Sequence, residues 1–402
     1  MKGMNRLNRV SLFAAAMALL SACSTTSTGA NALQSQPAGS AYAPALAADS
    51  VTPAAEAKER MPIYLTTMTH LEGSWIDDRD EELFLDHVGQ LRYGMDLFEE
   101  YGARMTVESE KPFARASVTW DVNVLAELVA RGHGVGTHCD IGFREDLMPV
   151  EDFAGLLKEN KDLVDALVGA ENNRGCSGAG GVNDWAAAGD LAGFDYINGT
   201  VAMHYLSMPM DARPGPEWTD EYIRNTAWHD QAPAGDLRAY PFAVADATDF
   251  EPDDPGIIVV LSGEFGRLDW AAEESAGRDC SRGCALTTAD VSAAVATLRE
   301  VDASRDPARV TKVTFYIPAE NFDESNEAVL RAFLEAMSAL ESEGVVQWAT
   351  QGEVYDAFIV AGGEPNDLPG REDIVAASTA PNVPTGTRPS GPRPTEGVLP
   401  RR

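Results

Sequence analysis

Short apolar, β-branched runs alternate with helix-periodic segments from about residue 60 to residue 360. The runs that have the length and composition of strands are PIYLTTMTH, ARMTVESE, GVGTHCD, FDYINGTVA, GIIVVLSGEF, VTKVTFYIPAE and VVQWATQ. The segments between them repeat apolar residues with the period of a helix, and two of these, DEELFLDHVGQLRYGMDLFEEYG and DVNVLAELVARG, end in glycine. This alternation predicts βαβ units and a parallel sheet.

The number of repeated units favours one of two α/β architectures. About seven or eight strand–helix units in a single stretch indicate a closed barrel. A doubly wound open sheet is the alternative, but no glycine-rich fingerprint follows the first strand. The segment from about 206 to 255, rich in Pro, Asp and Trp, interrupts the alternation. We therefore expect an α/β barrel of parallel strands over residues 59–362, with one long loop insertion.

The N-terminal residues have the pattern of a secretory signal. Basic residues precede the short apolar run SLFAAAMALL, which continues into SAC. Cysteine directly after LSA resembles the lipobox of bacterial lipoproteins, so residues 1–22 are expected to be removed and Cys23 to be lipidated. An ordinary signal peptide with a chance cysteine is the alternative. Ser24 resembles the signal for outer-membrane sorting in Gram-negative lipoproteins.

Composition predicts flexible segments on both sides of the barrel. Residues 23–58 are Ser, Thr, Ala, Pro and Gly with few large apolar groups, and the tail 363–402 is Pro-rich. The formal net charge is −32, so nucleic acid and anionic lipid surfaces are not expected partners. Nothing in the sequence indicates an oligomer. We expect a monomer in the cell envelope, held to the lipid bilayer through its acyl anchor alone and facing the periplasm or the cell surface.

Polar, mostly acidic residues stand at the ends of almost all the predicted strands. This is not the pattern of a filled structural core, and in parallel barrels the reactive groups gather where strands end and loops begin. In chain order the residues are His70, Glu72, Glu108, Glu110, His138, Asp140, Arg174, Glu264 and Glu320.

Two of these groups have the same spacing, His70 with Glu72 and His138 with Asp140. Side chains two residues apart on a strand share a face. Imidazole with carboxylate, without thiolate, suits zinc or another divalent first-row ion. We expect His70, Glu72 and His138 to hold one divalent ion, with Asp140 as a fourth ligand or as an orienter of His138. The alternative for each pair is a buried, hydrogen-bonded structural role.

The segments LAELVARGHGVGTHCDIG and NNRGCSGAGGVNDWAAAGDLAGFDYING resemble the polysaccharide deacetylase family, carbohydrate esterase family four. The resemblance implies a distorted (β/α)7 barrel with a divalent-metal site, in which a metal-bound water cleaves an N- or O-acetyl group from a glycan. It places His138 and Glu72 on metal ligands and Arg174 on the arginine that steadies the catalytic base. The carboxylates that are candidates for accepting the proton of the attacking water are Glu108, Glu264 and Glu320.

The chain departs from the family pattern at three places, one of which is the segment FYIPAE, which lacks the histidine that often serves as general acid. Leu71 stands where the family has its catalytic-base aspartate, and Gly142 stands where its second metal histidine should be. A leucine cannot accept a proton. Two functions therefore stay open. One is a rearranged active site, in which His70 and Asp140 replace the missing groups. The other is an inactive barrel that binds a glycan or supports an envelope complex.

The remaining cysteines form two possible pairs. Cys280 and Cys284 lie in the loop RDCSRGCA, where a small disulfide ring is expected in an exported protein and zinc binding is the alternative. Cys139 follows His138, and Cys176 follows Arg174 by two residues. For Cys139 and Cys176, a disulfide that braces the site and two buried free thiols both remain open.

Overall fold

The computed structural model describes residues 60–71, 76–139, 146–228, 239–248, 256–272 and 285–362. All of these residues lie in the second of two units into which the chain divides, 58–402. Within the described residues, no helix is both long and apolar enough to cross a membrane.

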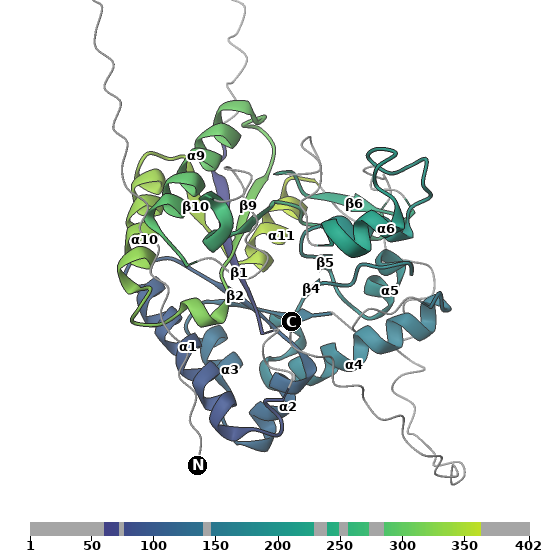
Figure 1. The fold of residues 1–402 in the computed structure, drawn as a ribbon, viewed down its shortest axis with the longest axis horizontal. Helices are drawn as coiled ribbons and strands as arrows, with labels where there is room; N and C mark the ends of the chain where they lie inside the picture. Colours follow the sequence, from purple (N-terminus) through teal and green to yellow (C-terminus); the bar gives the residue numbers. More distant parts are fainter. Residues whose placement is uncertain are drawn as a thin grey trace, which may run out of the picture. The chain divides into compact units, whose positions relative to one another are not determined.

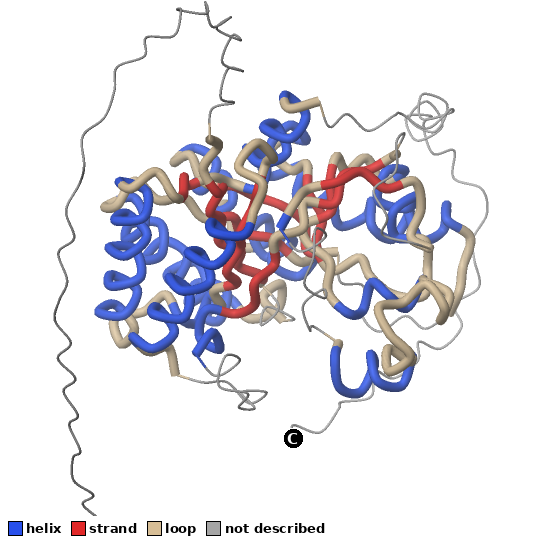
Figure 2. The backbone as a smooth tube through the Cα atoms, turned by 90° about the horizontal axis from the view of Figure 1, so that it is seen from above, coloured by secondary structure: helices blue, strands red, loops and turns tan. Residues whose placement is uncertain are grey.

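Ten strands form one sheet, and helices pack around it (Figures 1 and 2). The strands are β1 (Ile63–His70), β2 (Thr106–Ser109), β3 (Gly134–His138), β4 (Gly175–Ser177), β5 (Tyr196–Ile197), β6 (Phe242–Val244), β7 (Ile258–Val260), β8 (Glu264–Arg267), β9 (Thr311–Tyr316) and β10 (Val346–Trp348). The main helices are α1 (Glu81–Glu99), α2 (Lys111–Thr119), α3 (Val124–Ala130), α4 (Val150–Val168), α5 (Trp185–Leu191), α9 (Thr288–Ser304), α10 (Glu327–Ser342) and α11 (Gln351–Val360).

The order of the strands is β6-β7-β5-β4-β3-β2-β1-β9-β8, and β10 pairs with β1. All of these pairs are parallel except β6 with β7. Strand β1 pairs with β9 along one edge. Along its other edge it pairs with two strands in turn, because Ile63–Leu65 pair with β10 and Met68–His70 pair with β2.

A bend between β7 and β8 brings the two ends of this order together. Ser262 and Gly263 have positive φ values of 48° and 77°, so the chain turns within the apolar run that the sequence indicated as one strand. Before the bend, the Leu261 amide donates to the Ile197 carbonyl after β5; beyond it, the Thr314 amide of β9 donates to the Gly263 carbonyl. The same segment therefore contacts β5 and β9, and the sheet curls into a distorted barrel. The expected fold class is confirmed.

Side chains alternate between the inside and the outside of this barrel. The outward residues, including Leu65, Val107 and Val313, are buried in an apolar core with α1, α3, α9 and α10. Many inward residues are polar, among them the fully buried Thr66 and Thr314, whose hydroxyls meet at 2.5 Å. Polar groups thus line the barrel interior, and the apolar core lies between sheet and helices.

Three elements differ from the pattern predicted by the sequence. Helix α2, in KPFARASVT, follows β2 directly and had not been indicated. The segment GIIVVLSGEF forms β7 and β8 instead of one strand. The expected insertion, 206–255, contributes β6, which adds an antiparallel strand at the edge of the sheet.

Candidate metal centre

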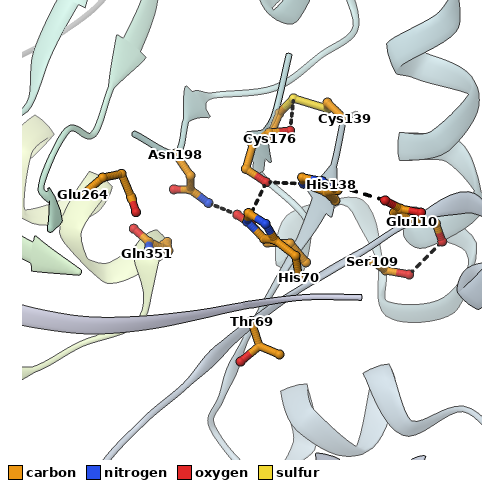
Figure 3. Close-up of polar contacts among 12 residues, drawn as sticks. Thr69, His70, Ser109, Glu110, His138, Cys139, Cys176, Asn198, Glu264 and Gln351 are labelled. Atoms are coloured by element: carbon orange, nitrogen blue, oxygen red, sulfur yellow. Dashed lines mark hydrogen bonds and ion pairs between the residues drawn. A yellow bond between two sulfur atoms is a disulfide. The ribbon is translucent and has the colours of Figure 1, made fainter. Parts of the chain in front are cut away.

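The last residues of β1 and β3 bring two imidazoles into contact (Figure 3). The rings of His70 and His138 stack with their centroids 4.1 Å apart and their planes at 25°. Strand β2 lies between the two strands and carries Glu108 opposite His70 in the register. On the other side Glu108 faces Gly136 of β3, where a Cβ atom would lie only 3.1 Å from the Glu108 Cγ. The glycine therefore leaves room for the Glu108 side chain beside the two imidazoles.

These three side chains form a set of donors suited to a divalent ion. His70 Nε2 lies 2.9 Å from Glu108 Oε2. One ligand atom from each of His70, Glu108 and His138 can be chosen so that all three lie within 4.8 Å of one another. Two imidazoles and one carboxylate are a ligand set of hydrolytic zinc and of other first-row ions. The residues present therefore fit the metal that the sequence predicted, with Glu108 as the carboxylate among the described residues.

Ser177, at the end of β4, belongs to the same cluster. Its Oγ is 2.9 Å from His138 Nδ1 and 3.3 Å from His70 Nε2, and it faces His138 in the register of β3 and β4. The sequence analysis did not single out Ser177. Its alternation with Cys176 on a strand would have placed it on the inward face, but the residue type alone gave no reason to choose it.

Glu108 is a buried carboxylate that is held in its ionised form. Burial alone would raise its pKa, but the hydrogen bond with His70, the charge of that imidazole and a hydrogen bond with Ser177 together hold the pKa below its ordinary value. The Asn198 side-chain amide donates to the other carboxylate oxygen. Glu108 therefore contributes a negative charge to the cluster although its side chain is fully buried.

Glu264 begins β8 and lies deeper in the polar interior. It packs over Gly199, where a Cβ atom would lie 2.0 Å from the Glu264 Cγ. Lys312 of β9 approaches it, with Nζ 3.5 Å from Glu264 Oε1 and 2.7 Å from the Ser262 carbonyl oxygen to which it donates. Burial raises the pKa of Glu264, and the charge of Lys312 opposes this only in part. Burial also lowers the pKa of Lys312. Sequence reasoning missed this lysine, although a lysine inside the apolar run VTKVTFY was a visible signal.

Arg174 does not lie where the sequence analysis expected it. It precedes β4, so it lies at the opposite end of that strand from Ser177. Its guanidinium binds Asp195 at 2.6 Å and Asp356 at 2.9 Å and stacks on Tyr355. The expectation that Arg174 ends a strand and steadies a catalytic base beside the metal ligands is therefore not met. Its bonds join β4 to the segment before β5 and to α11.

Three other positions named from the sequence are described. Glu110, at the N-terminus of α2, is buried, and its Oε1 lies 3.8 Å from His138 Nε2 (Figure 3). Glu320 is exposed in a short 3-10 helix (Ala319–Asn321) that follows β9. Leu71 is 2% exposed and belongs to the outer apolar core, so its side chain points away from the imidazoles. The remaining positions named from the sequence lie outside the described residues, namely Cys23, Glu72, Asp140, Gly142, Cys280 and Cys284.

A disulfide stands directly behind the cluster. Cys139 and Cys176 are bonded, with their Cα atoms 5.8 Å apart. Cys139 follows His138, and Cys176 precedes Ser177, so the bridge joins the two strand ends that carry these site residues. Of the two states left open for this pair, the structure has the disulfide.

No family model matches the sequence, and neither does any curated protein. Among solved structures, Puue allantoinase aligns with 76% of this chain and 93% of its own, at 11% identity and a TM-score of 0.49. A structure from Mycobacterium smegmatis described as a polysaccharide deacetylase aligns with 77% of this chain and 95% of its own, at 14% identity and a TM-score of 0.46.

A 4-alpha-glucanotransferase from Thermococcus litoralis aligns with 74% of this chain at 16% identity and a TM-score of 0.42, and this chain spans only 41% of its length. All three TM-scores are below 0.5, so these likenesses carry no argument about the activity of this chain.

Proposed function

We propose that this chain is a metal-dependent hydrolase of the deacetylase type, which removes an N- or O-acetyl group from a glycan. The observation that carries the proposal is the placement of His70, Glu108 and His138 at neighbouring strand ends, with their ligand atoms within 4.8 Å of one another. The sequence resemblance to polysaccharide deacetylases supports the same chemistry. A divalent ion, zinc first, would supply a Lewis acid for the acyl carbonyl and lower the pKa of a water.

The chain's own carboxyl groups divide into two roles. The pKa of Glu108 is held low and that of Glu264 is raised, and two carboxyl groups displaced in opposite directions are the usual arrangement of a charged stabiliser and a proton carrier. We assign Glu108 to the metal and Glu264 to proton transfer. Glu72 and Asp140 stay proposed as further ligands, and Glu320 as a carboxylate at the rim.

We further propose that the enzyme is an envelope lipoprotein anchored through Cys23, acting as a monomer on a glycan next to the membrane. The N-terminal sequence supports the anchor. A chain with a net charge of −32 is expected to repel polyanions such as nucleic acid, which agrees with a neutral or cationic substrate.

One experiment separates hydrolysis from glycan binding without turnover. Acetate release from a panel of acetylated glycans is measured with the wild-type chain, with the chain treated with a chelator, and with Glu108→Gln. We expect release by the wild type, loss with chelator, and recovery when zinc is added back. Glycan binding that is unaffected by chelator, with no acetate released, would contradict the proposal. That result would favour the binding-module alternative, with which the burial of Leu71 at the family's base position agrees.

A further inference from the structure

The Cys139–Cys176 disulfide lies next to the candidate metal centre, on the outer face of the strands. Both cysteines are fully buried, and their side chains belong to an apolar cluster with Phe153, Trp185 and Ile197. Because neighbours on a strand point to opposite faces, the sulfurs face away from the barrel interior while the adjacent His138 and Ser177 face into it. The bridge therefore does not offer a ligand, but it fixes the backbone from which two site residues project.

The described residues show how these strand ends are held together. Strands β3 and β4 share two register pairs, Thr137 with Cys176 and His138 with Ser177. Beyond them, the Cys139 amide donates to the Ser177 carbonyl at 2.6 Å, and no further β3–β4 pair follows within the described residues. On the α4 side, the Asn160 side chain donates to the His138 carbonyl at 2.6 Å. The disulfide is thus the covalent part of a small clamp at the end of the sheet.

The clamp holds the His138 ring between two polar side chains. Ser177 Oγ lies 2.9 Å from Nδ1, and Glu110 Oε1 lies 3.8 Å from Nε2. Outer partners of this kind fix the tautomer and the orientation of metal-binding histidines, and losing one commonly weakens metal binding 10- to 100-fold. A shift of β4 relative to β3 would separate Ser177 from His138 and remove this control.

We propose that the Cys139–Cys176 disulfide positions His138 and Ser177 for metal binding, so that the metal affinity of the chain depends on the oxidised bridge. This proposal rests on the metal centre of the proposed function. Reduction by a trialkylphosphine and water breaks the S–S bond, gives two thiols and a phosphine oxide, and frees β4 to move. The cysteines are positioning residues, and an oxidising compartment keeps the bridge closed.

The test is a Co²⁺ titration of the metal-free, full-length chain, followed by its visible absorption spectrum. We expect a Cys139→Ala, Cys176→Ala variant to bind Co²⁺ about 10- to 100-fold more weakly than the wild type, with an altered spectrum. Phosphine-reduced wild type, freed of phosphine, should show the same weakening, and reoxidation should restore the affinity. This second measurement needs no substituted chain, so it decides the question even if the variant does not fold.

Two matched controls separate positioning from general stability. Leu340→Ala opens the outer core at α10, far along the chain from the bridge, and should leave the Co²⁺ affinity and spectrum unchanged. Cys280→Ala with Cys284→Ala removes two sulfurs elsewhere and should also change neither. Wild-type affinity and spectrum in the bridge variant and in the reduced chain would overturn this inference alone. A wild-type chain that binds no Co²⁺ would overturn the proposed metal centre with it.

Discussion

At the scale of single residues, Glu108 is the side chain on which the proposed centre most depends. It is the described carboxylate whose ligand atom lies close to both imidazoles, and it is fully buried. Replacing Glu108 with Gln keeps its shape and removes its charge. We expect Zn²⁺ affinity, measured by competition with a chromophoric chelator, to fall at least about 100-fold, because losing a ligand costs more than losing an outer partner.

Arg174→Gln is the matched control for this substitution. Arg174 binds Asp195 and Asp356 at the other end of β4, so its loss should leave Zn²⁺ affinity unchanged and lower the free energy of unfolding by about 1 kcal/mol or less. Wild-type Zn²⁺ affinity in Glu108→Gln, or a loss in Arg174→Gln equal to that in Glu108→Gln, would remove Glu108 from the centre.

His133 gives the stability of the chain a dependence on pH. Its ring is buried, its Nδ1 accepts the Met105 amide, and burial lowers its pKa despite the nearby Glu99. Because the folded pKa lies below that of the unfolded chain, about 6.5, the folded state is fully favoured above that pH. Below it, the unfolded chain takes up a proton that the folded chain does not, so stability falls until the pH passes the folded pKa.

A denaturation series from pH 7 to pH 5 measures this effect. His133→Asn keeps an acceptor near Nδ1 but cannot take up the proton. We expect the free energy of unfolding of the wild type to fall more steeply than that of the variant, by up to about 1.4 kcal/mol per pH unit. Equal slopes in the two proteins would show that His133 does not titrate on unfolding.

At the scale of elements, a small residue in one segment makes room for a large one on a strand far along the chain. Gly199, directly after Asn198, has a φ of 67° and stands against Glu264 of β8. Gly199→Ala adds a Cβ in a left-handed conformation and in the space of the carboxylate. We expect it to lower the free energy of unfolding by about 2 kcal/mol or more, measured by urea denaturation.

Gly89→Ala in α1 is the control for the glycine substitution. Gly89 is exposed, with no atom within 4 Å of its added Cβ, so alanine there should raise the free energy of unfolding by about 0.5–1 kcal/mol. A tolerated Gly199→Ala would mean that Glu264 can leave its place beside Lys312 at little cost.

Elements also set the limit of what could be predicted from the sequence. The alternation of strands and helices, the barrel, and His70 and His138 as residues at its strand ends follow from periodicities that span many residues. Periodicity relates residues along one strand, so it paired His70 with Glu72. The pairing of His70 with Glu108 depends on the register between β1 and β2, which no spacing in the chain encodes.

The misplacement of Arg174 has a related cause. Strand β4 has only three residues, which is too few for a period to show where it begins. The sequence therefore predicts Arg174 after a strand, and the structure has it before β4. The bend at Ser262 could not be predicted for a different reason. Strand-like residues continue on both sides of it, so the segment has the composition of a single strand.

At the scale of the whole molecule, the proposed anchor would fix where the barrel acts. Cys23 lies outside the described residues, so lipidation stays a prediction. Cys23→Ala should release the chain from membranes into the soluble envelope fraction, because the acyl group is the only expected attachment. Fractionation with immunoblotting measures this, with Cys280→Ala as a control that should stay with the membranes. A Cys23→Ala chain that still sediments with membranes after a salt wash would contradict the lipoprotein assignment.

The bent segment that joins β7 to β8 also decides the order in which the molecule can be completed. Its first half has its partner, β5, already synthesised, but the partner of its second half, β9, comes later in the chain. Strand β9 also carries Lys312, the cation beside Glu264. A nascent chain that ends before β9 therefore has an open sheet in which Glu264 lacks its cation. Arrival of this late strand closes the sheet and brings Lys312 beside Glu264 in the same event, which makes completion of the barrel cooperative.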